Sequence, residues 1–337
     1  MPKMKIAVVP KPGADFEIQE REIPQPGPGQ VRVRVQACGV CYGDVLVKNG
    51  LWPGLTYPRS PGHEIAGVIA ELGPGVTTWK QGQRVGVGWH GGQDNTCLYC
   101  RRGDFGNCVQ LKVTGIDNDG GYAEYMIAPI ETLAQMADSL DAAEAGPLMC
   151  AGITTYNSLR HSVAMPGDLV AVQGIGGLGH LGVQFASKFG YRVAAISRGK
   201  ESEPLAKKLG ASIYIDSTAT NAAEELQKLG GAQVILATAP SGKAMTELIP
   251  GLAPRCTLLV VGAGADPVQV STALIIHGSK RIQGWASGIP ADSEETLRFA
   301  ELTGVRPMIE KFPLDQVNEA YARMMSGKAQ FRVVLTM

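Results

Sequence analysis

The chain has 337 residues, more than a single hydrophobic core usually supports, so we expect two domains. Hydrophobic residues at 45% and charged residues at 18% are typical of a soluble globular protein. Lysine plus arginine equals aspartate plus glutamate at 31 each, which leaves no positive surplus for binding nucleic acid. The N-terminus lacks the apolar core of a signal peptide, and no apolar run reaches membrane-spanning length. We therefore expect a cytoplasmic protein without nucleic-acid or membrane partners.

The first part of the chain, to about residue 148, is rich in glycine and proline. Its short alternating runs, such as VRVRV (31–35) and RVGVG (84–88), predict a compact β domain with long loops. From about residue 150, short apolar runs alternate with helix-length segments, which predicts a parallel, doubly wound sheet. Its expected strands are 168–174, 192–197, 212–216, 233–238, 256–262 and 281–287. Two helical stretches, roughly 292–303 and 315–326, precede a last strand that can return to the first domain.

A glycine-rich turn follows the first strand of the second domain. In VQGIGGLGHLGVQFA, Gly174, Gly176 and Gly179 stand in G-x-G-x-x-G order after a predicted strand and open a helix, with Gly177 in the same turn. A purely structural strand-to-helix turn is the plain alternative. The surrounding strand and helix favour a dinucleotide site, in which the backbone approaches a pyrophosphate at the helix N-terminus.

The end of the next strand bears on which nicotinamide cofactor is bound. In NAD sites an acidic residue usually accepts the ribose hydroxyl there. In this chain the strand ends AISRGKE, with Ser197 at the acidic position, followed by Arg198 and Lys200. These cations would attract a 2′-phosphate, so we predict NADP(H) in preference to NAD(H). The alternative is that Arg198 and Lys200 are solvated surface charges.

Three further stretches contain possible metal ligands, although none would be unusual alone. They are CGVCYGD (38–44), PGHEIAG (61–67) and PLMCAGITTY (147–156). Taken together, the three stretches resemble the pattern of the zinc-dependent medium-chain alcohol dehydrogenases. That pattern is Cys-x-x-Asp, then Gly-His-Glu, then a cysteine before the nucleotide domain. The resemblance covers essentially the whole chain. It is closest to the cinnamyl-alcohol and yeast-type bacterial enzymes, which share a Gly-Trp pair ahead of a zinc lobe. It implies an α/β two-domain fold: a GroES-like domain over 1–148, completed by 288–337, and a Rossmann domain over 149–287.

The resemblance also implies the roles of individual residues. Cys41, His63 and Cys150 would bind a catalytic zinc, and two thiolates with one imidazole leave the fourth position open for a substrate oxygen. Asp44 would orient the His63 ring, and Glu64 would be the acid beside the metal. The resemblance implies two further roles less directly: Thr154 would contact the nicotinamide, and Arg332 would contact the cofactor pyrophosphate. The active site is expected in the cleft between the domains.

The stretch DNTCLYCRRGDFGNC (94–108) places Cys97, Cys100 and Cys108 at metal-ligand spacing. In the family this lobe has four cysteines spaced three, three and eight residues apart. Counting back from Cys97 reaches Asp94, so the resemblance implies a structural zinc site with one carboxylate and three thiolates. An empty or partly oxidised lobe is the alternative. Cys38 and Cys256 fit neither site and are expected to be packed thiols.

The substrate pocket departs from the family pattern. Gly43 stands where most relatives carry the serine or threonine that relays the alcohol proton, and Leu46 replaces the relay histidine. We hypothesise that water carries the proton, and the alternatives are the phenol of Tyr42 or another group that the sequence does not identify. Trp52 and Trp89 fall in pocket-lining segments and favour primary alcohols and aldehydes, although both could be ordinary core tryptophans.

Three wider expectations follow from the same resemblance. The expected activity is hydride transfer between NADP(H) and an alcohol or aldehyde, in a homodimer or homotetramer. The missing relay leaves 1,4-reduction of conjugated carbonyls as the alternative activity. A zinc-lobed binding protein without turnover would lack a catalytic ligand, whereas Cys41, His63 and Cys150 are all present.

Overall fold

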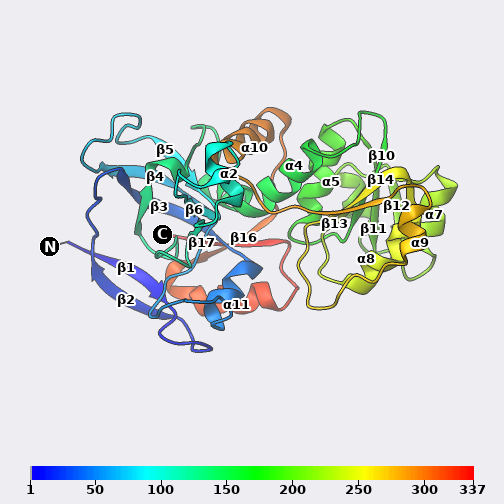
Figure 1. Ribbon diagram of the computed structural model, residues 1–337. Coiled ribbons are helices and arrows are strands. Elements are labelled where there is room, and N and C mark those ends of the chain that lie inside the picture. Colours follow the sequence, from blue (N-terminus) through cyan, green and yellow to red (C-terminus); the bar gives the residue numbers. More distant parts are fainter. Residues whose placement is uncertain (1) are drawn as a thin grey trace. The chain divides into compact units, whose positions relative to one another are not determined.

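A computed structural model describes residues 2–337, which divide into two compact units. The first unit comprises residues 2–150 and 288–337, and the second comprises Ala151–Ser287. Figure 1 shows the first unit as a mainly β body and the second as a sheet with helices on its faces. This architecture has the predicted division into a β domain and a domain built on a parallel, doubly wound sheet.

The core of the first unit is a seven-stranded sheet of mixed direction. Its strands follow the order β16-β17-β3-β4-β5-β9, and β8 also pairs with β3. β3 carries the predicted alternation, because its valines at 31, 33 and 35 are buried while the residues between them are not. The strands of this unit are β1 Lys3–Val8, β2 Glu17–Glu22, β3 Gln30–Val40, β4 Ile65–Leu72, β5 Arg84–Val87, β6 His90–Gly92, β7 Lys112–Val113, β8 Tyr125–Pro129, β9 Leu133–Gln135, β16 Ile309–Pro313 and β17 Arg332–Thr336.

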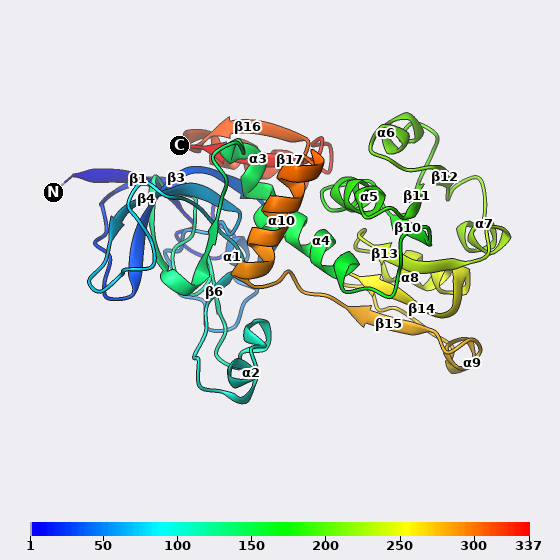
Figure 2. The ribbon, with the colours of Figure 1, turned by 90° about the horizontal axis from the view of Figure 1, so that it is seen from above.

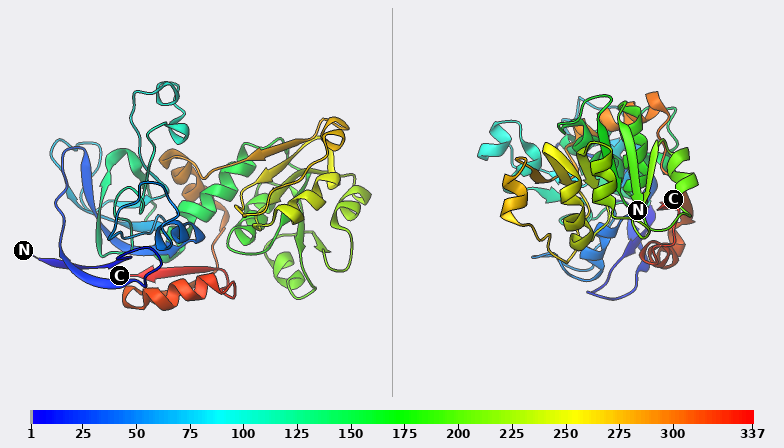
Figure 3. Two further views of the ribbon diagram at one scale, coloured as in Figure 1. Left: turned by 60° about the horizontal axis from the view of Figure 1, so that its bottom comes forward. Right: turned by 90° about the vertical axis from the view of Figure 1, so that its right-hand side faces the viewer.

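The C-terminal segment belongs to this first unit. β17 pairs antiparallel with β3, from Val333 opposite Val40 to Thr336 opposite Ala37. Figure 3 shows helix α11 lying along β17. The last strand therefore brings Arg332 beside the end of β3, where Cys41 follows. The helices of this unit are α1 Val45–Lys48, α2 Leu98–Arg101, α3 Ala142–Pro147, α10 Pro290–Thr303 and α11 Val317–Met325.

The second unit is a six-stranded sheet in the order β12-β11-β10-β13-β14-β15, in which every pairing is parallel. Figure 2 shows α5 and α6 along one face of the sheet and α7 and α8 along the other. All six predicted strands are present, and β14 begins four residues earlier than the sequence indicated. The elements are α4 Ile153–Arg160, β10 Leu169–Gln173, α5 Gly179–Lys188, β11 Arg192–Ser197, α6 Glu203–Lys208, β12 Ile213–Asp216, α7 Ala222–Lys228, β13 Ala232–Ala237, α8 Gly242–Leu248, β14 Leu252–Val260, α9 Thr272–Ile276 and β15 Arg281–Gly284.

The buried residues explain why these elements form two separate cores. The strands of the second unit read as continuous apolar runs, as expected for a parallel sheet covered on both faces, and β10 is buried at all five positions. Cys38 lies in the core of the first unit and Cys256 in that of the second, as predicted for packed thiols. Within residues 2–337, no helix combines the length and apolar character needed to cross a membrane.

Candidate metal centres and nucleotide-binding turn

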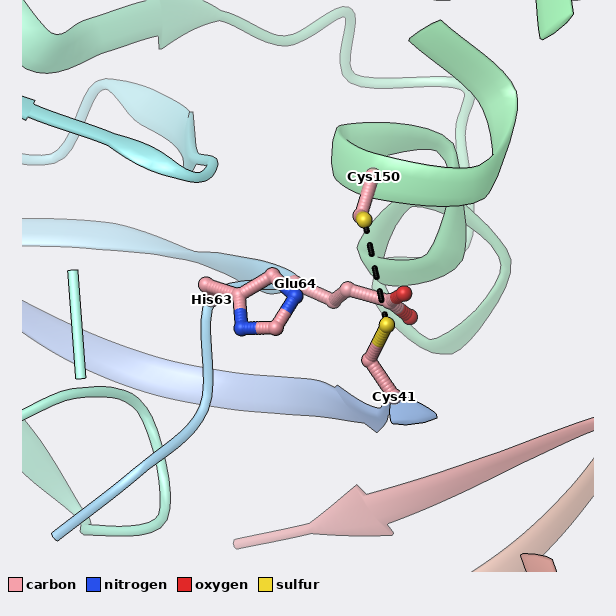
Figure 4. A group of neighbouring side chains, drawn as sticks. All are labelled: Cys41, His63, Glu64 and Cys150. Carbon is pink, nitrogen blue, oxygen red and sulfur yellow. Dashed lines mark hydrogen bonds between the residues drawn. The ribbon is translucent and has the colours of Figure 1, made fainter. Parts of the chain in front are cut away.

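Four side chains from distant parts of the sequence meet in the first unit: Cys41, His63, Glu64 and Cys150 (Figure 4). Their ligand atoms all lie within 4.8 Å of one another. Cys41 follows β3, His63 and Glu64 precede β4, and Cys150 sits in a π-helical turn, Leu148–Gly152. The three residues expected to bind a catalytic metal are thus brought together, with Glu64 beside them.

The local fold prepares Cys41 as a ligand. It caps the short 3-10 helix Tyr42–Asp44, and its Sγ accepts a hydrogen bond from the Gly43 N–H at 3.4 Å. The Asp44 carboxylate reaches back to the Cys41 N–H at 2.9 Å, which completes a capping box. The hydrogen bond to Cys150 lowers the pKa of Cys41, burial opposes this, and the charge of His63 lowers the pKa further. The arrangement favours a thiolate, the form that binds metals.

His63 is held through one ring nitrogen while the other lacks a hydrogen-bond partner. Nδ1 lies 3.3 Å from Oδ1 of Asp44, and both side chains are almost completely buried. Nε2 is buried without a hydrogen-bond partner. A buried polar atom left unpaired is costly, and a metal ion would satisfy it. Asp44 therefore occupies the place expected of the carboxylate that orients a metal-binding histidine.

The spacing of the two thiols also fits a metal. Sγ of Cys41 and Sγ of Cys150 are 3.9 Å apart. Two sulfur ligands at about 2.3 Å from a tetrahedral zinc lie about 3.8 Å from each other. The observed separation is thus close to that of a zinc dithiolate. Two sulfur donors and one imidazole form a set that suits zinc and leaves a coordination position open.

Glu64 belongs to the same cluster and forms a buried ion pair with Arg332. Its Oε1 accepts a short hydrogen bond from Nη2 of Arg332, and both side chains are buried. Burial raises the pKa of Glu64 to about 8, although the Arg332 charge works in the opposite direction. Burial also works against the charge of Arg332, but Glu64 and Cys41 outweigh it and raise the arginine pKa. Oε2 of Glu64 and Nε of Arg332 have no hydrogen-bond partner.

Two tryptophans flank the cluster. The Trp89 ring meets the His63 ring edge-on, with centroids 4.8 Å apart at 89°, and it also contacts Trp52 at 6.1 Å. A side chain at Gly43 would compete for this space. Its Cβ would lie 3.0 Å from Cε1 of His63 and 3.3 Å from Cζ3 of Trp89. The Trp89 ring therefore packs closely against position 43, where the chain has no side chain and so no hydroxyl.

A second candidate metal centre lies in the lobe around α2, which projects from the β body of the first unit (Figure 2). Asp94, Cys97, Cys100 and Cys108 have ligand atoms within 4.8 Å of one another. Oδ1 of Asp94 accepts the N–H groups of Thr96 at 2.7 Å and Cys97 at 2.8 Å. The Cys97 N–H and then that of Thr96 lower the pKa of Asp94, so the carboxylate is ionised.

The thiols of this lobe are supported by the backbone. Sγ of Cys97 accepts the Cys100 N–H at 3.5 Å, and Sγ of Cys108 accepts the N–H groups of Asp94 and Gln110, both at 3.4 Å. The N–H groups of Cys100 and Val109 lower the pKa of Cys97. One carboxylate and three thiols form a closed set of four donors, the number that a structural zinc site takes.

The glycine-rich turn joins β10 to α5, as its sequence context indicated. Gly174 has φ +89°, and a Cβ at Gly179 would lie 1.9 Å from the Gly174 carbonyl oxygen, so the turn itself requires both glycines. At Gly176 a Cβ would meet no atom within 4 Å. This open space is what a pyrophosphate needs to approach the backbone. Gly177 is half-buried in the same turn, and Thr154 is buried in α4.

The loop after β11 carries the residues expected to choose between cofactors. Ser197 ends the strand, and Arg198 and Lys200 are exposed. The loop is anchored by Asp216, whose Oδ1 accepts the Gly199 N–H at 2.8 Å. The exposed cations are therefore attached to a backbone with a defined position.

Several partnerships in the first unit had no signal in the sequence. The sequence suggested Arg332 as a cofactor ligand and Glu64 as an acid beside the zinc, but gave no reason to pair them across 268 residues. It also gave no reason to connect Gly43 with Trp89, or Asp44 with a tyrosine 78 residues away. These contacts follow from the sheet order, which periodicity and motif spacing do not reveal.

Comparisons with known proteins agree with this architecture. Residues 27–138 match the alcohol dehydrogenase GroES-like domain family, and residues 177–302 match the zinc-binding dehydrogenase family. An alcohol dehydrogenase of Penicillium expansum is 45% identical over 333 residues, covering 99% of this chain and 97% of that protein. The solved structure of a Sorghum bicolor cinnamyl alcohol dehydrogenase is 31% identical with a TM-score of 0.89, covering 99% of this chain and 98% of the other. A Helicobacter pylori CAD complexed with NADP(H) is 26% identical with a TM-score of 0.87, covering 99% and 98%.

The chain belongs to the zinc-dependent medium-chain alcohol dehydrogenase family, which confirms the resemblance read from its motifs. Within that family it is an enzyme of the alcohol dehydrogenase type.

The buried Glu64–Arg332 pair leads to a prediction about stability. At pH 9, above the Glu64 pKa of about 8, Arg332→Met should lower the free energy of unfolding by about 3–5 kcal/mol, because it leaves a buried carboxylate without its counter-charge. Adding Glu64→Gln should recover a large part of this loss, since the pair is then replaced by neutral groups. Urea unfolding of the three proteins measures both changes.

The control is Arg323→Met, which breaks the partly exposed Arg323–Glu310 pair of the same unit. It should cost no more than about 1 kcal/mol. If the double variant were as unstable as Arg332→Met alone, the loss would come from packing and not from an unpaired charge.

Proposed function

We propose that the chain is a zinc-dependent alcohol dehydrogenase and aldehyde reductase that prefers NADP(H) and acts on primary alcohols and aldehydes. The observation that carries the proposal is the convergence of Cys41, His63 and Cys150, with the His63 Nε2 atom buried and unpartnered. Zinc held by these three residues would supply Lewis-acid polarisation of a substrate oxygen, and a bound nicotinamide would supply the hydride chemistry. A cytoplasmic location and a homodimeric or homotetrameric assembly stay predictions from the sequence.

The residues around the centre have separate tasks in this mechanism. Asp44 fixes the tautomer and direction of the His63 ring, so that Nε2 faces the thiols. Arg332 is the buried partner of Glu64 beside the cluster, and its charge favours the ionised form of that carboxyl group. Trp89 and Trp52 offer an apolar aromatic wall next to His63, which suits an aldehyde carrying an apolar group.

Gly43 favours a second candidate activity. The chain lacks a hydroxyl at this position, and a Cβ there would require the His63 and Trp89 rings to shift by a few tenths of an ångström. An oxygen that receives no relayed proton is a poorer target for 1,2-reduction. The alternative is 1,4-reduction of a conjugated carbonyl, in which the hydride attacks the alkene carbon.

Cinnamaldehyde with NADPH tests the proposed function, because this substrate offers a carbonyl and a conjugated alkene to the same hydride. We expect cinnamyl alcohol as the product, identified by chromatography, with water carrying the proton. Benzaldehyde, which has no conjugated alkene outside its ring, is the matched control and should also be reduced. Dihydrocinnamaldehyde as the main product would replace the proposed reaction by the 1,4-reduction, and consumption of neither aldehyde would contradict both.

The NADP(H) preference is supported by the exposed Arg198 and Lys200 after β11, and by Ser197 as the last residue of that strand in place of an acidic one. Arg198→Asp should raise KM for NADPH about tenfold or more while changing KM for NADH much less, because a charge-assisted contact with the 2′-phosphate is lost. Steady-state kinetics with the two cofactors measures this difference. Arg192→Asp is the control, because Arg192 is an exposed arginine at the opposite end of β11. An equal change in both KM values would contradict the assignment.

The second zinc is proposed to be structural and held by the lobe, with Asp94 as its only oxygen ligand. Asp94→Ala should leave one zinc ion fewer per chain than the wild type after dialysis against a weak chelator, whereas Asp94→Cys should retain it. Asp104→Ala is the control, since Asp104 lies in the same lobe and the hydrogen bonds described for its carboxylate come from the Asn107 side-chain amide. Unchanged zinc content in Asp94→Ala, measured by atomic absorption, would remove Asp94 from the site.

A further inference from the structure

Tyr122 is a fully buried tyrosine to which neither the motifs nor the proposed mechanism assigns a task. Its hydroxyl donates a hydrogen bond to Oδ2 of Asp44 at 2.8 Å. Burial and next the Asp44 charge raise the pKa of Tyr122 well above its usual value, so the phenol keeps its proton. The phenol is therefore a permanent donor to the carboxylate that holds His63.

The Asp44 carboxylate is shared among three segments of the chain. Oδ2 accepts from the Cys41 N–H at 2.9 Å as well as from Tyr122. Oδ1 accepts from the Gly62 N–H at 3.2 Å and faces Nδ1 of His63 at 3.3 Å. Each oxygen thus serves one backbone donor and one side chain. Loss of the phenol would leave Oδ2 with a single donor in a buried site and free the carboxylate to rotate away from His63.

The backbone places Tyr122 for this contact. The N–H groups of Gly120, Gly121 and Tyr122 donate to the carbonyls of Ser60, Gly62 and Pro61 at 2.8, 3.0 and 3.1 Å. The residue before His63 accommodates the ring: Gly62 has φ +101°, and a Cβ there would lie 2.5 Å from Cδ1 of Tyr122. The tyrosine therefore packs directly against the backbone that presents the ligand.

An ordinary explanation is that a buried tyrosine needs an acceptor for its hydroxyl and finds Asp44. That explanation predicts an effect on stability alone. The geometry points to more, because the acceptor is the carboxylate that faces Nδ1 of His63. We propose that Tyr122 is a positioning residue for the metal centre, which acts through Asp44 to hold the His63 ring in its ligating orientation. This inference rests on the proposed zinc site at Cys41, His63 and Cys150.

The test measures zinc binding without turnover. Full-length protein is stripped of metal and titrated with Zn²⁺ against a chromophoric chelator, which resolves the two centres as separate binding phases. His63→Ala identifies the phase of the first centre and Asp94→Ala that of the lobe. Tyr122→Phe should raise the dissociation constant of the His63-dependent phase about 10- to 100-fold, the range for loss of an outer partner of a metal ligand. The lobe phase, an internal reference, should stay within about twofold.

Tyr57→Phe is the matched control. Tyr57 lies in the same unit, and its hydroxyl donates to the Val47 carbonyl and not to Asp44 or a proposed zinc ligand. It should leave both zinc phases unchanged. An unchanged His63-dependent phase in Tyr122→Phe, or equal weakening of both phases, would overturn the inference. No effect of His63→Ala on either phase would overturn the proposed zinc site itself, which separates the two failures.

A double-mutant cycle tests whether Tyr122 acts through Asp44 or by a separate route. Asp44→Asn keeps the shape of the carboxylate but weakens its hold on Nδ1. Because Tyr122 acts through Asp44, adding Tyr122→Phe to Asp44→Asn should weaken zinc binding by less than about twofold further. A full additional loss of affinity in the double variant would show that the tyrosine acts by another route and would overturn the inference.

Discussion

The buried carboxylate of Asp44 is the interaction on which the metal cluster depends. It closes the turn that presents Cys41, accepts a hydrogen bond from the Gly62 N–H and faces Nδ1 of His63. A charge that is nearly completely buried is stable only when its hydrogen bonds are made, and Asp44 makes them with groups from three segments of the chain. The same bonds that stabilise the charge therefore fix two of the proposed ligands.

The buried pair of Glu64 and Arg332 depends on the same need to compensate a buried charge. Glu64 and Arg332 come from opposite ends of the chain and meet because β17 pairs with β3. Each would be costly to bury alone, so the C-terminal strand contributes a counter-charge as well as a sheet edge. Gly43 and Trp89 illustrate the opposite case, in which the absence of a side chain makes room for an aromatic ring next to His63.

The two units differ in how much of their structure local sequence patterns predict. In the second unit, β10 is a continuous apolar strand, and the glycines that follow are required by a left-handed backbone at Gly174 and a close contact at Gly179. Local rules are enough there. In the first unit the ligands lie on turns between strands of a mixed sheet, and their meeting depends on strand order. Recognition of the motif identified Cys41, His63 and Cys150 by their resemblance to a family and not by any local rule.

The sequence by itself determined the strands and helices of the nucleotide-binding unit, its glycine-rich turn and the candidate ligands, because apolar periodicity and motif spacing are local properties. Only the tertiary structure decided the partners: Arg332 with Glu64, Trp89 above Gly43, and Tyr122 with Asp44. These contacts join residues far apart in the chain. Which of them meet is set by the register of the sheet and by the need to satisfy buried charges, neither of which any short stretch of sequence expresses.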